Sequence, residues 1–160
     1  STNIKNRVYG IKDKNFPTFS AINSSGTVAQ CKTAPTCPGG SDLGWYVDLA
    51  NKQKLTAEPT IYKDRVYYPI YQPTSGGTGC NTGTALLTAY NSKCGNSVLN
   101  VNVGTGVLSK VVVQKDNLYI GIAGEAKENI AGFTSKDNLI TGKSKAKGGG
   151  AISVEGWKQN

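Results

Sequence analysis

Four cysteines are the residues of this chain whose type and spacing could do covalent chemistry. They form two couples that are close in sequence, Cys31 with Cys37 and Cys80 with Cys94, each in a polar stretch rich in Gly, Pro and Thr. Among the three possible pairings, these two local disulfides are favoured. The alternative is four free or metal-binding thiols, although zinc sites use closer cysteine pairs or histidine. Because disulfides persist in the periplasm or outside the cell, we expect an exported protein.

The chain contains no histidine among its 160 residues. A Ser-His-Asp triad, a histidine general base, a CxxCH haem attachment and a histidine-ligated metal are therefore excluded. We expect no metal, no cofactor and no catalysis. Ten carboxylates remain, and Glu125 with Glu128, in an expected loop, leaves a paired-carboxylate glycosidase site as an open alternative.

Lysine and arginine give the chain a formal net charge of +8, which favours anionic partners such as phosphates or acidic glycans. Because most lysines are spread along the sequence, solubility is the simpler explanation. One cluster, Lys136, Lys143, Lys145 and Lys147, runs into three glycines. Since no aromatic residues interleave with it, this cluster favours a mobile loop over a docking patch, and it predicts no specific nucleic-acid binding.

Aromatic side chains are the other candidates for contact with a partner, because they can stack on sugar rings or build a protein interface. The alternative is that they fill the core, which we expect of Trp45, Tyr67 and Tyr119. Tyr71 and Trp157 remain candidate contacts.

Composition indicates the elements that must position these residues. Twenty Gly, six Pro and a 38 % hydrophobic share rich in Val, Ile and Tyr favour short strands and turns over long helices. No stretch approaches the roughly 18 apolar residues that span a bilayer, and the first residues lack the apolar core of a signal peptide. We expect one β-rich unit over residues 1–160, cut from a longer exported protein.

An internal repeat sets the predicted architecture. Residues 57–70 align without a gap with residues 109–122, an offset of 109 − 57 = 52. Each copy has the pattern of a strand, a two-residue polar turn and a second strand, which predicts two β-hairpins. The expected turns are Lys63-Asp64 and Asp116-Asn117. Because aspartate suits turns, Asp64 and Asp116 need no catalytic explanation.

Two more strands are expected after the first hairpin, at residues 84–91 and 98–103. In the second of these, Val101 and Val103 share one face of the strand. Pro69 lies within the second strand of the first hairpin and lacks an N–H, so it predicts an edge, a bulge or an early strand end.

Antiparallel four-stranded repeats of about fifty residues are typical of β-propeller blades. The expected fold is all-β, with about two to two and a half blades in a partial propeller or open sheets. Residues 1–50 would end one blade and add a long disulfide-pinned loop, 51–104 would form a full blade, and 105–160 a further blade with the Lys/Gly-rich loop. Because so few blades cannot close a ring, their unpaired edges should associate with another chain.

Six segments carry a family resemblance through their order and spacing: Arg7–Asp13, Gly44–Leu49, Pro59–Tyr62, Val66–Pro73, Cys80 with Gly83–Asn91, and Leu118–Gly124. They resemble the final propeller blades of PilY/PilC-type proteins of the type IV pilus. This resemblance implies a cell-surface protein, exported through the periplasm, that contacts pilin or minor pilins in fimbrium assembly and cell adhesion. The family's calcium loop has no counterpart, because residues 13–15 lack its spaced carboxylates and glycine.

Two functions follow as expectations. The first is a non-catalytic module that binds pilin-like subunits, surfaces or the rest of a larger propeller through strand edges and loops. The second is a secreted lectin-like binder of acidic glycans or other anionic surface polymers, which would use the lysine loop and exposed aromatic residues. A periplasmic quinoprotein-like enzyme is disfavoured, because the ring is incomplete and no two cysteines are adjacent.

Overall fold

The computed structural model describes residues 5–11, 28–30, 44–74 and 82–147, and its regular elements there are all β-strands. The predicted all-β class with antiparallel sheets is confirmed. Within these ranges no helix is long and apolar enough to cross a membrane. The strands are β1 (Arg7–Ile11), β2 (Val28–Gln30), β3 (Gly44–Asp48), β4 (Lys54–Leu55), β5 (Thr60–Tyr62), β6 (Arg65–Gln72), β7 (Thr84–Asn91), β8 (Ser97–Leu108), β9 (Val112–Gln114), β10 (Asn117–Ala126), β11 (Phe133–Lys136) and β12 (Leu139–Lys143).

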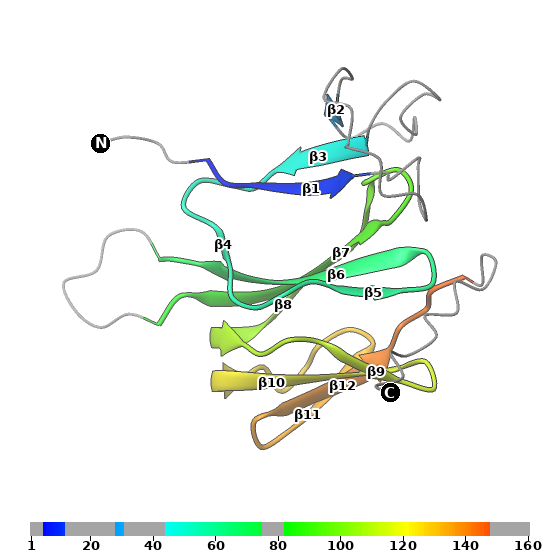
Figure 1. The fold of residues 1–160 in the computed structure, drawn as a ribbon. Helices are drawn as coiled ribbons and strands as arrows, with labels where there is room; N and C mark the ends of the chain where they lie inside the picture. Colours follow the sequence, from blue (N-terminus) through cyan, green and yellow to red (C-terminus); the bar gives the residue numbers. More distant parts are fainter. Residues whose placement is uncertain (1–4, 12–27, 31–43, 75–81, 148–160) are drawn as a thin grey trace, which may run out of the picture.

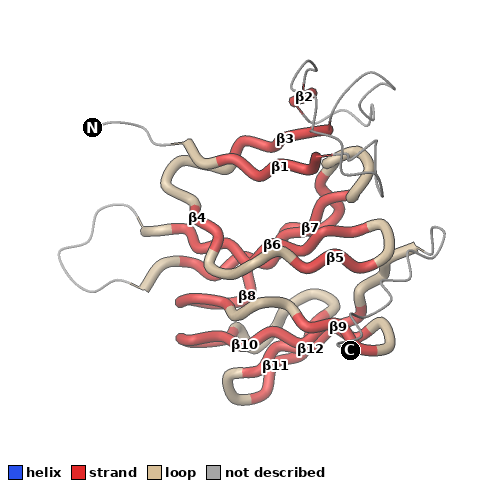
Figure 2. The backbone as a smooth tube through the Cα atoms, viewed as in Figure 1, coloured by secondary structure: helices blue, strands red, loops and turns tan. Residues whose placement is uncertain are grey.

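The strands stack in three layers (Figures 1 and 2). The first layer is a sheet of order β1-β3-β2, in which β1 runs antiparallel and β2 parallel to β3. The second layer holds β4 to β7 with the first part of β8, and the third holds β9 to β12. Because the end of β8 pairs with the end of β10, a continuous ladder of strands joins the second layer to the third.

Three glycines allow this connection between β8 and β10. Gly104, Gly106 and Gly124 have φ angles of 149°, 111° and 152°. Residues other than glycine rarely adopt these backbone angles. A Cβ on Gly106 would lie 2.1 Å from the carbonyl oxygen of Ala123 on the facing strand. β8 therefore continues past the expected strand at 98–103, since glycine lets the two backbones approach.

Hydrophobic side chains fill both spaces between the layers. Neighbouring residues on β6 point to opposite sides of the sheet, so Tyr67 faces the third layer while Val66 and Tyr68 face the first. The centre of the middle layer, formed by β6 and β7, is thus buried on both faces. The cluster toward the third layer is Tyr67, Ala85, Leu87, Ala89, Val103, Leu108, Val111, Leu118, Ile120, Ile122, Ile130 and Ile140. The cluster toward the first layer is Val8, Trp45, Leu49, Val66, Tyr68, Ile70 and Tyr90.

The two predicted hairpins are confirmed, as β5 paired with β6 and β9 paired with β10. The first turn is Lys63-Asp64, as predicted. The second is Lys115-Asp116, one residue earlier than predicted, because Asn117 already belongs to β10. Lys115 and Asp116 take the left-handed φ values of 46° and 65° that tight two-residue turns require.

Pro69 lies inside β6, and not at the edge, bulge or strand end that its missing N–H predicts. One side of β6 pairs with β7 throughout, and the other pairs first with β5 and then with β4. The carbonyl oxygen of Pro69 accepts a hydrogen bond from the backbone N–H of Thr56 at 3.0 Å, on the side of these short strands. The missing N–H faces the same side, so the β6–β7 ladder loses no bond.

Candidate functional site

The sheet of the third layer turns one face to the core, and no described residue covers its other face. On β10, Leu118 and Ile120 are buried, so Asn117 and Tyr119 point outward. Residues paired directly with them on β9, β11 and β12 share that side. We call this surface the outer face; it consists of Val112, Gln114, Asn117, Tyr119, Thr134, Lys136, Leu139, Thr141 and Lys143.

The outer face combines apolar, hydroxyl, amide and cationic groups. Val112 and Leu139 are 58 % and 44 % exposed. The hydroxyls of Thr134 and Thr141 are hydrogen-bonded to each other at 2.8 Å. An open cavity of about 510 Å³ lies here, and such a mixture is typical of binding surfaces. Its lining residues are Asn117, Tyr119, Gly132, Phe133, Thr134, Thr141, Gly142 and Lys143.

The internal repeat relates the outer face to a covered one. The offset of 52 places Tyr119 at the position of Tyr67. Tyr67 is fully buried beneath the third layer, and its hydroxyl donates a hydrogen bond to the carbonyl oxygen of Ser144 at 3.0 Å. Tyr119, by contrast, is only partly buried. The core prediction therefore holds for Trp45 and Tyr67 but is wrong for Tyr119, because no further layer in the described ranges covers it.

The first layer has an exposed aromatic face at the opposite end of the stack. Tyr9 and Tyr46 are paired across β1 and β3, and their ring centroids are 5.9 Å apart. The guanidinium of Arg7 lies 4.8 Å from the Tyr46 ring centroid and bonds Asp48 at 2.6 Å. Ile11, on the same side of β1, is 54 % exposed. Both ends of the stack thus present sheet faces that no described strand covers.

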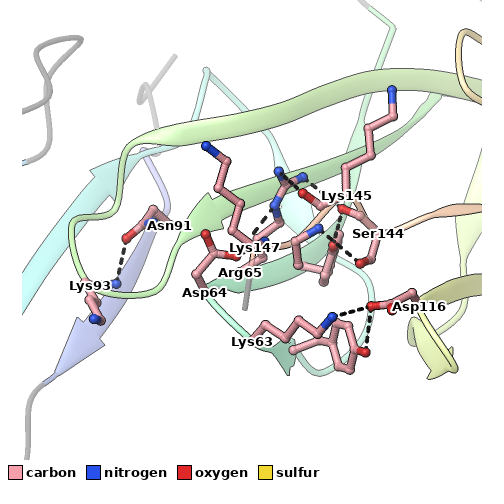
Figure 3. Close-up of polar contacts among 12 residues, drawn as sticks. Lys63, Asp64, Arg65, Asn91, Lys93, Asp116, Ser144, Lys145 and Lys147 are labelled. Atoms are coloured by element: carbon pink, nitrogen blue, oxygen red, sulfur yellow. Dashed lines mark hydrogen bonds and ion pairs between the residues drawn. The ribbon is translucent and has the colours of Figure 1, made fainter. Parts of the chain in front are cut away.

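Basic residues gather where the turns of the second and third layers lie together (Figures 2 and 3). Four backbone segments meet there: the β5–β6, β7–β8 and β9–β10 turns and the residues after β12. Seven cationic side chains lie there together with two carboxylates, Asp64 and Asp116, so the formal net charge of this region is +5. The formal net charge of the whole chain is +8. We call this the basic end; its cations are Lys63, Arg65, Lys93, Lys115, Lys143, Lys145 and Lys147.

Residues 144–147 are fixed to the second layer, in contrast to the predicted mobile loop. The guanidinium of Arg65 donates hydrogen bonds to the carbonyl oxygens of Ser144 and Lys145, at 2.9 and 2.8 Å (Figure 3). The backbone N–H of Lys147 donates to the Asp64 carboxylate at 3.1 Å. Residues 136–143 lie in the β11–β12 hairpin. The cluster is therefore ordered as far as Lys147, although its sequence has the composition of a loop.

The Asp116 carboxylate is held ionised by its two neighbours. Hydrogen bonds from Lys63 at 2.7 Å and from the Tyr62 hydroxyl at 2.8 Å lower the pKa of Asp116. The same contact with Asp116 raises the pKa of Lys63. Asp116 therefore links the two hairpin turns through Tyr62 and Lys63.

The predicted contact residues do not form one site. Lys136 pairs with Leu139 at the tip of the β11–β12 hairpin, whereas Lys143 lies at the other end of β12. Arg65 begins β6, and Tyr71 lies near the other end of the same strand. There the Tyr71 hydroxyl accepts a hydrogen bond from the N–H of Gly83 at 3.2 Å. Trp157 lies outside the described residues.

The carboxylates and cysteines singled out in the sequence do not come together in one site within the described residues either. Glu125 belongs to β10 and is paired with Thr105, so it is not in a loop as predicted. Cys94 is disulfide-bonded. Cys31, Cys37 and Cys80 lie outside the described residues, and the two local pairings stay predictions. The described part of the chain contains no group of three or more cysteines or carboxylates that could hold a metal.

Comparison with protein-family models, with curated proteins and with solved structures finds no significant match to this chain.

Proposed function

We propose that this chain is a non-catalytic binding module, in which the three layers form about two to two and a half blades of a partial β-propeller. From the resemblance described above, we propose further that it belongs to an exported PilY/PilC-type protein of the type IV pilus. Its partners would be pilin or minor pilins, or the rest of a larger propeller.

One observation carries this proposal: the outer face repeats a face that the molecule itself covers. Where a further layer follows, Tyr67 and its neighbours are buried. Where none follows in the described ranges, the equivalent Tyr119 pairs with the exposed Val112 on β9, and the exposed Leu139 lies on the same face of β12. Exposed apolar surface of this kind marks protein contacts. The disulfide at Cys94 supports an oxidising compartment, as export requires.

The first test changes the outer face by the double substitution Val112→Asp and Leu139→Asp. Two desolvated carboxylates would oppose any apolar contact there. The fraction of purified chain that co-sediments with sheared type IV pili is expected to fall about tenfold or more, as for loss of an interface hot spot.

Ile61→Asp is the matched control, because Ile61 is 69 % exposed on β5 of the middle layer and lies outside the outer face. This variant should sediment with pili like the unmodified chain. Equal sedimentation of the double variant would show that the outer face is not the contact. An unmodified chain that never accompanies pili would overturn the pilus assignment.

The cavity on the outer face favours a second function, binding of an acidic glycan. The Tyr119 ring offers a stacking surface for a sugar, and Asn117 and the two threonine hydroxyls offer hydrogen bonds. Lys143 lines the same cavity and would pair with a sugar carboxylate.

Retention on an acidic-glycan array tests this second function. Tyr119→Ala and Lys143→Gln are each expected to weaken retention at low salt about tenfold, since each removes a principal contact. Retention of the unmodified chain should also fall at high salt, because the ion pair is exposed to screening. Lys136→Gln is the control for general charge loss, because Lys136 lies at the far end of the β11–β12 hairpin and does not line the cavity. If it reduces retention as much as Lys143→Gln does, binding is non-specific.

A further inference from the structure

The basic end carries more positive charge than contacts within the molecule use. Of its lysines, only Lys63 pairs with a carboxylate within the described ranges. We propose that this surface binds an acidic polysaccharide, whose repeated carboxylates pair with lysines from three separate segments of the chain. These lysines are exposed and lie in the β7–β8 turn, in the β9–β10 turn, and at and after the end of β12: Lys93, Lys115, Lys143, Lys145 and Lys147.

Asp64, in the β5–β6 turn, fixes the backbone of two of these segments. Its carbonyl oxygen accepts a hydrogen bond from the N–H of Ser92 at 2.8 Å, and Ser92 precedes Lys93. Its carboxylate accepts one from the N–H of Lys147 at 3.1 Å (Figure 3). Because both bonds go to one residue, the backbones at Lys93 and Lys147 have a defined position relative to each other.

Asp116 has the same role for the β9–β10 turn and the residues after β12. Its carbonyl oxygen accepts a hydrogen bond from the N–H of Ser144 at 2.9 Å. Ser144 is 2 % exposed, whereas the lysines on either side of it are exposed. The Asp116 carboxylate accepts hydrogen bonds from Lys63 and Tyr62. The basic end thus combines an ordered backbone with five lysines that form no ion pair within the described ranges.

The number and kind of the cations indicate the class of partner. Five lysines on three segments exceed the charge of a single small anion, so a polymer with repeated charges fits them best. A lysine ammonium group is a compact point charge on a flexible stem, so it pairs with carboxylates in many orientations. These properties favour a polysaccharide that carries a carboxylate on each sugar.

Single-stranded nucleic acid fits this surface less well. Its sequence-independent binding sites combine cations with aromatic rings on which the bases stack. Tyr62, which precedes the β5–β6 turn, does not offer a free ring. Its hydroxyl donates a hydrogen bond to Asp116, and the Lys63 ammonium lies 5.2 Å from its ring centroid. The described turns of the basic end therefore offer charge rather than a stacking surface.

The basic end adjoins the cavity on the outer face, because Lys143 belongs to both. A polysaccharide with one sugar in the cavity can therefore extend over the basic end. Binding at the basic end depends on neither proposed function, since it requires neither a pilus nor a sugar in the cavity.

Calorimetric titration with a galacturonate dimer and a galacturonate decamer at low salt tests this surface. The decamer should bind the unmodified chain at least about tenfold more tightly than the dimer, because a longer polymer engages several lysines at once. The triple variant Lys93→Gln, Lys115→Gln and Lys147→Gln is expected to weaken decamer binding about tenfold. Exposed ion pairs are individually weak, and three of them are lost together.

The triple variant Lys54→Gln, Lys127→Gln and Lys136→Gln is the matched control, because it removes the same charge at the opposite ends of the strands. It should bind the decamer nearly as the unmodified chain does. Equal losses in the two triple variants, or no decamer binding by the unmodified chain, would overturn the proposal. Tighter binding of a single-stranded DNA of equal charge would assign the surface to nucleic acid instead.

Tyr119→Ala separates the basic end from the cavity. It removes the stacking surface of the cavity and leaves the lysines of the basic end in place. In this background, the triple substitution at the basic end should still weaken decamer binding about tenfold. If Tyr119→Ala alone abolishes decamer binding and the lysine substitutions have no effect, the polysaccharide binds in the cavity only. That result would support the second proposed function and contradict a site at the basic end.

Discussion

Replacement of Trp45 by alanine is expected to lower the free energy of unfolding by about 3–5 kcal/mol, the usual cost of removing a buried aromatic side chain. Trp45 is 1 % exposed between the first and second layers, and its ring lies against Gly10 and Gly95. Truncation would leave a cavity there and would remove the hydrogen bond to the carbonyl oxygen of Ser92. Urea unfolding followed by far-ultraviolet circular dichroism measures the change.

Tyr46→Ala is the matched control, because Tyr46 is the next residue on β3 and points to the other side of the sheet. Its ring lies beside Tyr9, which is 51 % exposed, so we expect a loss of under about 1.5 kcal/mol. Hydrogen exchange should also accelerate in β1 and β3 of Trp45→Ala. Equal losses for the two variants would contradict the assignment of Trp45 as the main contact between these layers.

The strands of the middle layer could be predicted from sequence because local pattern specifies them. The apolar run at 84–91 coincides with β7. The alternation at the start of β8 puts Val103 in the core and leaves Asn100 and Asn102 exposed, as period two requires. Such signals depend only on the chain near each residue.

Burial of the aromatic residues could not be predicted in the same way. Tyr67 and Tyr119 occupy equivalent repeat positions, and their neighbours on the strand are similar. Their exposure differs because a further layer covers one and not the other within the described ranges. The repeat that predicts the hairpins therefore gives no information about which copy ends the stack.

The course of the lysine segment after β12 depends on a residue distant in sequence. Lysine and glycine around residue 147 have the composition of a loop, so the prediction of a mobile segment followed from local content. Its position is set by Arg65, 79 residues before Ser144. A contact of this range has no local signature, and only the fold brings the two together.

Arg65→Met is expected to lower the free energy of unfolding by about 2–4 kcal/mol, because two charge-assisted hydrogen bonds are lost at once. The carbonyl oxygens of Ser144 and Lys145 would lose the guanidinium, whose side chain is only 16 % exposed. Urea unfolding measures the loss of stability. Amide exchange at residues 145–147 should rise by about tenfold or more, since this segment would lose its main attachment to β6.

Arg7→Met provides the control, since Arg7 is the chain's other arginine and bonds a carboxylate where its side chain is 47 % exposed. Screened surface pairs contribute little, so this variant should unfold at nearly the same urea concentration as the unmodified chain. Arg65→Lys should fall between the two, because an ammonium lacks the planar fork that reaches both carbonyl oxygens. If Arg65→Met costs no more than Arg7→Met, the segment after β12 is held by Tyr67 and Asp64 instead, through the Ser144 carbonyl oxygen and the Lys147 amide.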